Sequence, residues 1–235
     1  LATADLAGLT VIPAANYSGS ATFKVSAIAT EREGDQAVRQ QNVTMNFAAV
    51  ADAPVIANTS LTGTEDNAIP LALGLGLTDK DGSETLGNLI ISNLPAGATV
   101  TNATYNSDGS WTVAKTQLNN AAIIPPEHWS GDATFTVTAT STETSNNQSA
   151  TLTKTINLHV DAVADAPVLS VSDAHGTPDG PIALDFSASL TDTDGSEKLS
   201  LVVSGLPEGT MLSAGLNNGD GSWTLAQGDL KNLTI

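Results

Sequence analysis

Hydrophobic and polar residues alternate along much of the chain with a period of two. Phe135, Val137 and Ala139 alternate with the threonines at 134, 136, 138 and 140, and residues 23–27 and 156–160 show the same pattern. Clusters of Gly, Pro, Asn and Asp separate these runs, and no stretch of helical length shows a period of 3.6. Alternation with Thr and Val, bounded by turn residues, indicates strands that are buried on one face. The pattern therefore predicts an all-β fold.

The chain also repeats itself at a spacing of 112 or 113 residues. The sequence ADAP at 51–54 returns at 164–167, DKDGSE at 79–84 returns as DTDGSE at 192–197, and DGSWT at 108–112 returns at 220–224. We expect residues 1–53 to be the C-terminal half of one repeat, 54–166 a complete repeat, and 167–235 the N-terminal part of a third. The chain then reads as a piece of a longer array.

Within the complete repeat, short alternating runs separated by turns predict seven strands. They are expected at 55–62, 68–77, 88–93, 98–105, 110–114, 133–141 and 151–160. Seven short strands in a repeat of about 113 residues are typical of an immunoglobulin-like or cadherin-like β-sandwich. The half-repeats at the two ends are then completed either by a longer chain or by head-to-tail contacts with another molecule, whose strands 22–30 and 43–47 would supply the missing part.

The composition excludes several classes of partner. The chain has 25 acidic and 8 basic residues, for a net charge of −17, so we expect no nucleic-acid partner, because the protein would repel phosphate. Its longest apolar run, near 68–77, is much shorter than the roughly 20 residues of a membrane span. There is no Cys, so disulfides and thiolate metal sites are excluded.

Acidic residues recur at equivalent positions of successive repeats, whereas none of the eight basic residues does. The matching pairs are Glu31/Glu143, Asp52/Asp165, Asp66/Asp179, Asp79/Asp192, Asp81/Asp194, Glu84/Glu197 and Asp108/Asp220. Acids that served only solubility would drift in position as the lysines do. Their fixed places predict that something other than Lys or Arg balances their charge.

The strand order of a sandwich gathers these acids at the ends of the repeats. Loop 79–84, the Asp108 turn, Glu143 and the linker residue Asp52 fall at one end of the complete repeat. Glu65 and Asp66 fall at the other end, facing Asp165 and loop 192–197. Carboxylates at this density repel unless a cation lies among them, and Ca²⁺ takes six to eight oxygen ligands. The candidate Ca²⁺ ligands are Asp52, Glu65, Asp66, Asp79, Asp81, Glu84, Asp108, Glu143, Asp165, Asp179, Asp192, Asp194 and Glu197.

Simpler roles for these residues remain open. Asp-Gly pairs such as Asp108-Gly109 form turns without any metal, and the acids before Ala-Pro can merely space a linker. Loop 79–84 resembles the start of an EF-hand but lacks that motif's third Asp and its Glu at position twelve. The three histidines do not recur in phase and there is no Cys, so the sequence disfavours zinc and copper.

The sequence offers no catalytic constellation, and we expect no enzyme. It contains no Gly-x-Ser-x-Gly motif, its histidines have no recurring partners, and aromatic residues are too few to line a sugar cleft. Trp111 and Trp129 are expected to pack at the core or its edge. Two alternatives stay open: a carbohydrate- or protein-binding module anchored by one of these tryptophans, and a spacer attached to a secreted enzyme.

Five motifs together resemble the tandem extender repeats of giant bacterial surface adhesins of the RTX type. They are TED at 64–66, LTDKDGSE at 77–84, LPAGA at 94–98, DGSWT at 108–112 and VADAP at 163–167. The resemblance implies Ca²⁺ at the junctions, type I secretion, an extracellular cell-surface location, and projection of an adhesive tip for attachment or biofilm formation. Neighbouring repeats of the same chain would be the partners. Pro178, where the complete repeat has Glu65, departs from the pattern.

Overall fold

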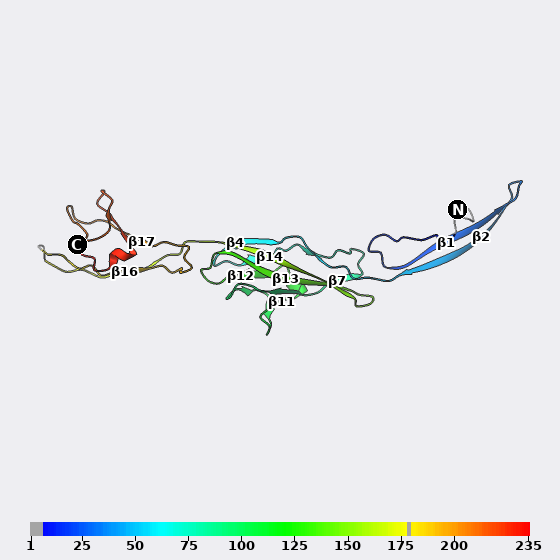
Figure 1. The fold of residues 1–235 in the computed structure, drawn as a ribbon, viewed down its shortest axis with the longest axis horizontal. Helices are drawn as coiled ribbons and strands as arrows, with labels where there is room; N and C mark the ends of the chain where they lie inside the picture. The colour runs from blue at the N-terminus through cyan, green and yellow to red at the C-terminus, as the bar shows by residue number, and fades with distance from the viewer. Residues whose placement is uncertain (1–6, 178–179) are drawn as a thin grey trace. The chain divides into compact units, whose positions relative to one another are not determined.

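The computed structural model describes residues 7–177 and 180–235, and their regular structure is almost entirely β (Figure 1). Helix is limited there to two short 3-10 turns, η2 (Lys115–Gln117) and η3 (Gln227–Leu230). None of the described helices has the length and apolar character needed to cross a membrane. The predicted all-β class is confirmed.

The contacts group the residues into two compact units. The first takes residues up to Leu61, Ile69–Ile124 and Ala133–Leu158. The second takes Thr62–Ala68, Pro125–Asp132 and His159–Ile235. The repeat boundaries inferred from the sequence remain a prediction.

A long antiparallel hairpin opens the first unit. Strands β1 (Gly19–Thr30) and β2 (Gln36–Phe47) pair from Gly19 opposite Phe47 to Thr30 opposite Gln36 (Figure 1). Phe23 on β1 and Val43 on β2 belong to the alternating pattern, yet both are exposed.

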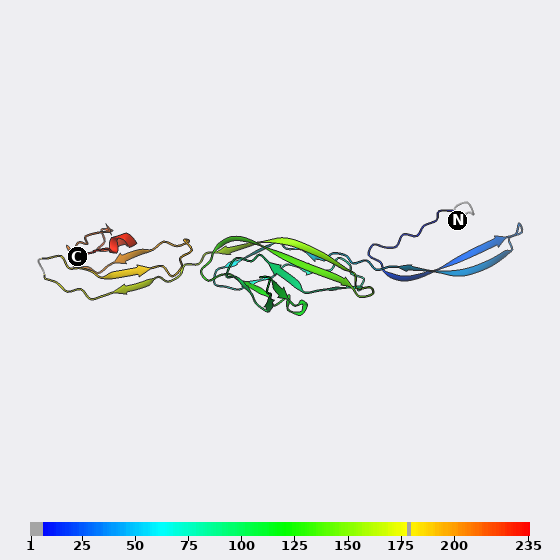
Figure 2. The ribbon, with the colours of Figure 1, turned by 60° about the horizontal axis from the view of Figure 1, so that its bottom comes forward.

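Residues 54–166 form several paired sheets. The largest has the order β10–β11–β8–β13–β14–β4, and β7 also pairs with β13. Its strands are β4 (Ser60–Thr64), β7 (Glu84–Leu86), β8 (Leu89–Ser92), β10 (Ala103–Tyr105), β11 (Trp111–Val113), β13 (Gly131–Glu143) and β14 (Ser149–Asp161). The others are β5 (Ile69–Pro70), β12 (Ala122–Ile124) and β9 (Thr99–Val100) in one sheet, and β3 (Val55–Ile56) with β6 (Leu75–Gly76). Figure 2 shows the long strands β13 and β14 as neighbours.

The period of two places the core. Phe135 and Val137 on β13, and Leu158 on β14, are fully buried, while the threonines between the β13 positions are half-buried. Ile69 and Ile123 of the three-stranded sheet are buried as well. Each sheet thus turns its alternate apolar residues inward, as a β-sandwich requires.

Three of the predicted strands are interrupted. The run at 55–62 divides into β3 and β4, the run at 68–77 into β5 and β6, and the run at 98–105 into β9 and β10. At the break the Asn58 amide donates to the carbonyl of Ala72 at 2.7 Å, and the backbone there passes close to Gly74. A Cβ added at Gly74 (φ +61°) would lie 3.0 Å from the Ala57 Cβ, so only glycine suits this approach. Strand β12 was not predicted, because its short run ends at two prolines.

The second unit contains the last five strands. They are β15 (Val168–Val171), β16 (Phe186–Ser189), β17 (Ser200–Val203), β18 (Leu216–Asn217) and β19 (Trp223–Ala226). Strand β15 pairs with β16, and β19 lies between β17 and β18. Leu212, Trp223, Leu225 and Leu233 form a buried cluster. Leu225 is equivalent in the repeat to Val113, and both are fully buried, so the core position is preserved between repeats.

Equivalent phenylalanines allow a matched test of this core. We expect Phe135→Ala to lower the free energy of unfolding by about 3–5 kcal/mol, because Phe135 is only 1% exposed. Phe23→Ala should cost clearly less, because the equivalent Phe23 is 39% exposed. Urea unfolding of the full chain, followed by circular dichroism, measures both values. Equal losses would contradict the assigned core.

Candidate metal centres

Five acids form what we call the N-terminal carboxylate cluster. They are Asp52, Asp79, Asp81, Glu84 and Glu143, of which Asp79, Glu84 and Glu143 are buried. Antiparallel pairing of β7 with β13 places Glu84 directly opposite Glu143. Asp79 and Asp81 lie in the loop that precedes β7, and so the loop and the two strand ends supply the cluster together.

Serine hydroxyls and backbone amides hold this loop in shape. Asp79 accepts a hydrogen bond from the amide of Asp81 at 2.8 Å, and Asp81 accepts one from the amide of Ser83 at 2.7 Å. The Ser83 hydroxyl lies 3.3 Å from an Asp79 oxygen and 3.1 Å from a Glu143 oxygen. These bonds fix the loop with its carboxylates drawn together.

Residues ahead of the complete repeat join the same cluster. The amide of Asp52 in the ADAP linker donates to Glu84, and the Ser141 hydroxyl donates to the carbonyl of Asp52. The Ser18 hydroxyl donates to Asp81 at 3.1 Å. The cluster therefore links the segment before Pro54 to the repeat that follows it.

A second group, the C-terminal carboxylate cluster, comprises Glu65, Asp165, Asp192, Asp194 and Glu197. Its hydrogen bonds repeat those of the first cluster one repeat later. They run from the Asp165 amide to Glu197 at 2.6 Å, from the Asp194 amide to Asp192 at 2.8 Å, from the Ser196 amide to Asp194 at 2.7 Å, and from the Ser130 hydroxyl to Asp194 at 2.8 Å. The recurrence shows that the arrangement is a property of the repeat.

Glu65 joins this second cluster from the segment ahead of the linker. It is buried, and the amide of Val163 donates to one of its oxygens. Oxygens of Glu65, Asp192 and Asp194 lie within 4.8 Å of one another, and Asp192 is buried too. Three carboxylates from two separate segments thus converge on one small volume.

Neither cluster pairs with Lys or Arg among the described residues, and only Asp165 of the second cluster faces a histidine, His128. In the part of the chain that the structure describes, every ion pair within 4.0 Å has a histidine as its positive member, and none has Lys or Arg. Oxygens of Glu65, Glu84, Glu143 and Glu197 are enclosed without any hydrogen-bond partner. Leaving ionised oxygens buried and unpaired is costly. Such oxygens fit the ligand set of a hard divalent cation.

The pKa values express the same imbalance. Burial raises the pKa of Glu84, and repulsion from Glu143, Asp52 and Asp79 raises it further. The hydrogen bond from the Asp52 amide lowers the pKa, but not enough to cancel these effects. The pKa of Asp194 is held far below its usual value by the hydrogen bonds from Ser196 and Ser130. The charged form of Glu84 is therefore disfavoured where it lies and would be stabilised by a cation, whereas Asp194 stays ionised.

Two of the expected ligands, Asp108 and Asp66, are not brought into these clusters. Asp108 is exposed and accepts hydrogen bonds from the amide and hydroxyl of Ser110, at 3.0 and 2.7 Å, as an Asp-Gly turn does. Asp220 makes the same bonds to Ser222. Asp66 lies beside His128, whose backbone amide donates to it at 2.9 Å. Asp179 lies outside the described residues.

His128 is the residue that the sequence analysis missed. Its Nδ1 lies 2.8 Å from an oxygen of Asp165 and 3.4 Å from an oxygen of Asp66. Desolvation lowers its pKa, but the carboxylates of Asp165 and Asp66 outweigh that effect and the net shift is upward. The comparison of repeats passed over it because the equivalent residue is Asn16.

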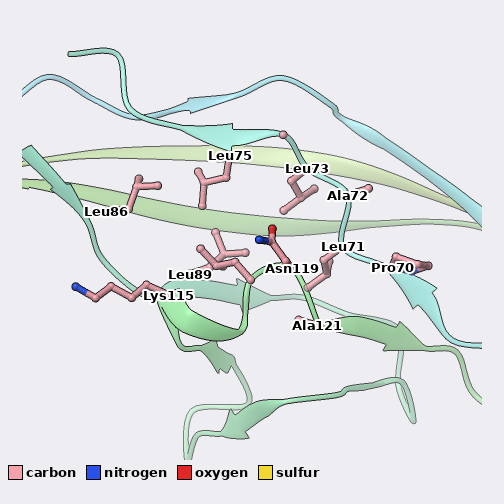
Figure 3. A pocket seen from close by; sticks show the side chains of 12 residues that line it. Pro70, Leu71, Ala72, Leu73, Leu75, Leu86, Leu89, Lys115, Asn119 and Ala121 are labelled. Carbon is pink, nitrogen blue, oxygen red and sulfur yellow. The ribbon is translucent and has the colours of Figure 1, made fainter. Parts of the chain in front are cut away.

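An apolar hollow of about 460 Å³ lies elsewhere in the first unit (Figure 3). Its lining is mostly leucine, including Leu71, Leu73 and Leu89, and its polar side chains are Lys115 and Asn119. Figure 3 shows the leucines directed toward one another, while Lys115 extends away from them. No acid or histidine lines this hollow, and it presents no acid–base pair.

Glu84→Gln tests the charge imbalance directly. In EDTA we expect this variant to melt at a higher temperature than the wild type, because glutamine can keep the bond from the Asp52 amide while removing a buried charge. The metal-free wild type should also lose stability as the pH rises through the raised pKa of Glu84, and the variant should lose less.

Asp108→Asn is the control and should behave as the wild type in this respect, because Asp108 is exposed and bonded within its own turn. Thermal unfolding followed by circular dichroism from pH 4 to 8 measures both effects. A lower melting temperature for Glu84→Gln in EDTA would contradict the interpretation.

Comparison with known proteins agrees with this architecture. Residues 51–158 match the family model of the bacterial Ig domain, from the ADAP linker to β14. A search of curated proteins found no match. Bacterial Ig domains are non-catalytic modules, typically of surface or extracellular proteins. The predicted immunoglobulin-like sandwich is confirmed, and residues 51–158 are similar to a bacterial Ig domain.

Proposed function

We propose that this chain is an extender segment of a bacterial surface adhesin, in which Ca²⁺ at the two carboxylate clusters stiffens the connection between successive repeats. The observation that carries the proposal is the same in both clusters. Each holds buried carboxylate oxygens with no hydrogen-bond partner, and each is joined by a residue from ahead of the ADAP linker, Ser18 in the first and Glu65 in the second.

The donor set favours Ca²⁺ over other ions. Both clusters offer carboxylate oxygens on loops and strand ends, and Ca²⁺ accepts many oxygens in flexible geometry. Asp79, Asp81, Glu84 and Glu143, with Asp52, would hold it in the first cluster. In the second the ligands would be Glu65, Asp192, Asp194 and Glu197, with Asp165. Bound Ca²⁺ would supply the positive charge that no Lys or Arg provides.

The effect of the ion would be mechanical. Without it, repulsion among the carboxylates leaves each linker a hinge; with it, ligands on both sides of the linker hold one angle. A row of such repeats would become a stiff stalk that projects an adhesive tip for attachment or biofilm formation. A chain without Cys also suits export in an unfolded state by type I secretion, with folding outside the cell, where Ca²⁺ is abundant.

Calcium should raise the melting temperature of the full chain, and EDTA should reverse the rise. At a free Ca²⁺ concentration one hundred times Kd, each site contributes about 2.7 kcal/mol. Asp192→Asn should reduce the effect, because Asp192 is a buried member of the second cluster. Asp220→Asn is its matched control, since Asp220 bonds only to Ser222 among the described residues. An unchanged melting temperature with Ca²⁺ would overturn the proposal.

Spin labels test the stiffening itself. The chain has no Cys, so Lys24→Cys with Thr104→Cys places two labels at exposed sites on either side of the first ADAP linker. The distribution of distances between the labels should be broad in EDTA and should narrow in Ca²⁺, because shared ligands fix the linker. A distribution of the same width in both conditions would leave Ca²⁺ without a mechanical role.

One observation favours a second candidate function, that of a carbohydrate- or protein-binding module. Tyr105 is 63% exposed, and its ring lies 4.9 Å from that of Trp111 at an angle of 54°. Trp129 is half-buried. Binding of the full chain to a glycan array, lost in Tyr105→Ala, would support this function; no binding by the wild type would remove the glycan version of it.

A further inference from the structure

His128, Asp66 and Asp165 form a third group that differs in chemistry from the two carboxylate clusters. One ligand atom from each residue lies within 4.8 Å of the others, and the group combines an imidazole nitrogen with two carboxylates. Asp66 is exposed, and His128 and Asp165 are partly buried. This is a mixed nitrogen and oxygen donor set.

Three separate segments position the group. Asp66 follows β4 in a left-handed turn (φ 57°), and His128 lies between β12 and β13 with φ 54°. The amide of His128 donates to one oxygen of Asp66 at 2.9 Å, which leaves the other oxygen 3.4 Å from Nδ1. Asp165 is held by the bond from its own amide to Glu197. The backbone thus orients each side chain.

The closest contact in the group joins Nδ1 of His128 to an oxygen of Asp165, 2.8 Å away. Both atoms are enclosed, and the contact is an ion pair when the imidazole is protonated. Even a protonated imidazole supplies one positive charge against Asp66, Asp165 and Glu127, which lies 3.7 Å from Nε2. An electronegative pair so placed fits two ligands of one ion.

We propose that Asp66, His128 and Asp165 bind a divalent transition-metal ion of the zinc type. Imidazole and carboxylate together suit Zn²⁺ and Co²⁺, whereas Ca²⁺ prefers oxygen alone. Water completes the coordination. Glu127 faces the other ring nitrogen, where histidine ligands commonly meet a carboxylate. The site shares Asp165 with the C-terminal carboxylate cluster, and it differs from that cluster in having an imidazole among its donors.

The repeat itself supplies the comparison. Asn16 is the residue equivalent to His128, and it has the same left-handed backbone (φ 61°). Asp52 is equivalent to Asp165, and Ser18 to Ser130. The two junctions therefore share their carboxylate and serine frame, and the imidazole is present at only one of them.

Zinc titration of the full chain, with Ca²⁺ saturating, tests the proposal. Isothermal calorimetry should show one Zn²⁺ site, and His128→Asn should weaken it by about tenfold or more. This variant installs the side chain that the other repeat carries on the same backbone, so the fold is retained. His159→Asn is the control: His159 lies against Asp132 and Asp161 and should leave Zn²⁺ binding unchanged.

Two further measurements make the result decisive. Co²⁺ should give visible absorption bands that are lost in His128→Asn, while the Ca²⁺-dependent rise in melting temperature stays as in the wild type. Asp192→Asn should keep the Co²⁺ absorption bands and reduce the Ca²⁺-dependent rise in melting temperature. The two variants together separate failure of this site from failure of the Ca²⁺ clusters. No Zn²⁺ binding by the wild type would reduce the group to an ion pair, and unchanged binding in His128→Asn would place the metal elsewhere.

Discussion

Buried like charge is the constraint on which the ends of this repeat depend. Glu84 and Glu143 face each other across paired strands, and Glu65 meets Asp192 one repeat later. Amide and hydroxyl donors occupy some of their oxygens, but others are enclosed and unpaired. If burial of the apolar core alone determined the fold, these charged side chains would lie in water. Their burial leaves negative charge at the joint that no Lys or Arg in the described part of the chain balances.

The same strands contribute residues both to the core of the sandwich and to the carboxylate clusters. The inward residues of β13, such as Phe135 and Val137, close the core, and the strand then runs on to deliver Glu143 beyond it. Ser141, two residues before that end, reaches the linker carbonyl of Asp52. Strand length therefore decides how far the core is coupled to the linker. A shorter strand would preserve the sandwich and lose the joint.

Much of this could be predicted from the sequence, and the misses have physical reasons. Strict alternation located β13 and β14, whereas the break between β5 and β6 depends on a close backbone approach at Gly74 that no hydrophobic pattern encodes. Recurrence in phase selected the acids of both clusters except Glu65, whose equivalent is Pro178. It also selected Asp108, since an Asp-Gly turn recurs for conformational reasons. His128 was missed because comparing equivalent positions selects residues that recur, and the residue equivalent to His128 is Asn16.

The linker amides have a consequence for how the joints can evolve. The bonds from the amides of Asp52 and Asp165 to Glu84 and Glu197 belong to the backbone, so a change of side chain at either linker residue leaves them in place. Only proline, which lacks an N–H, would abolish them. Changes in the side chains of the linker therefore leave the path of the backbone at the joint unchanged. Neighbouring joints can acquire different side chains while the linker keeps the same distance to Glu84 or Glu197.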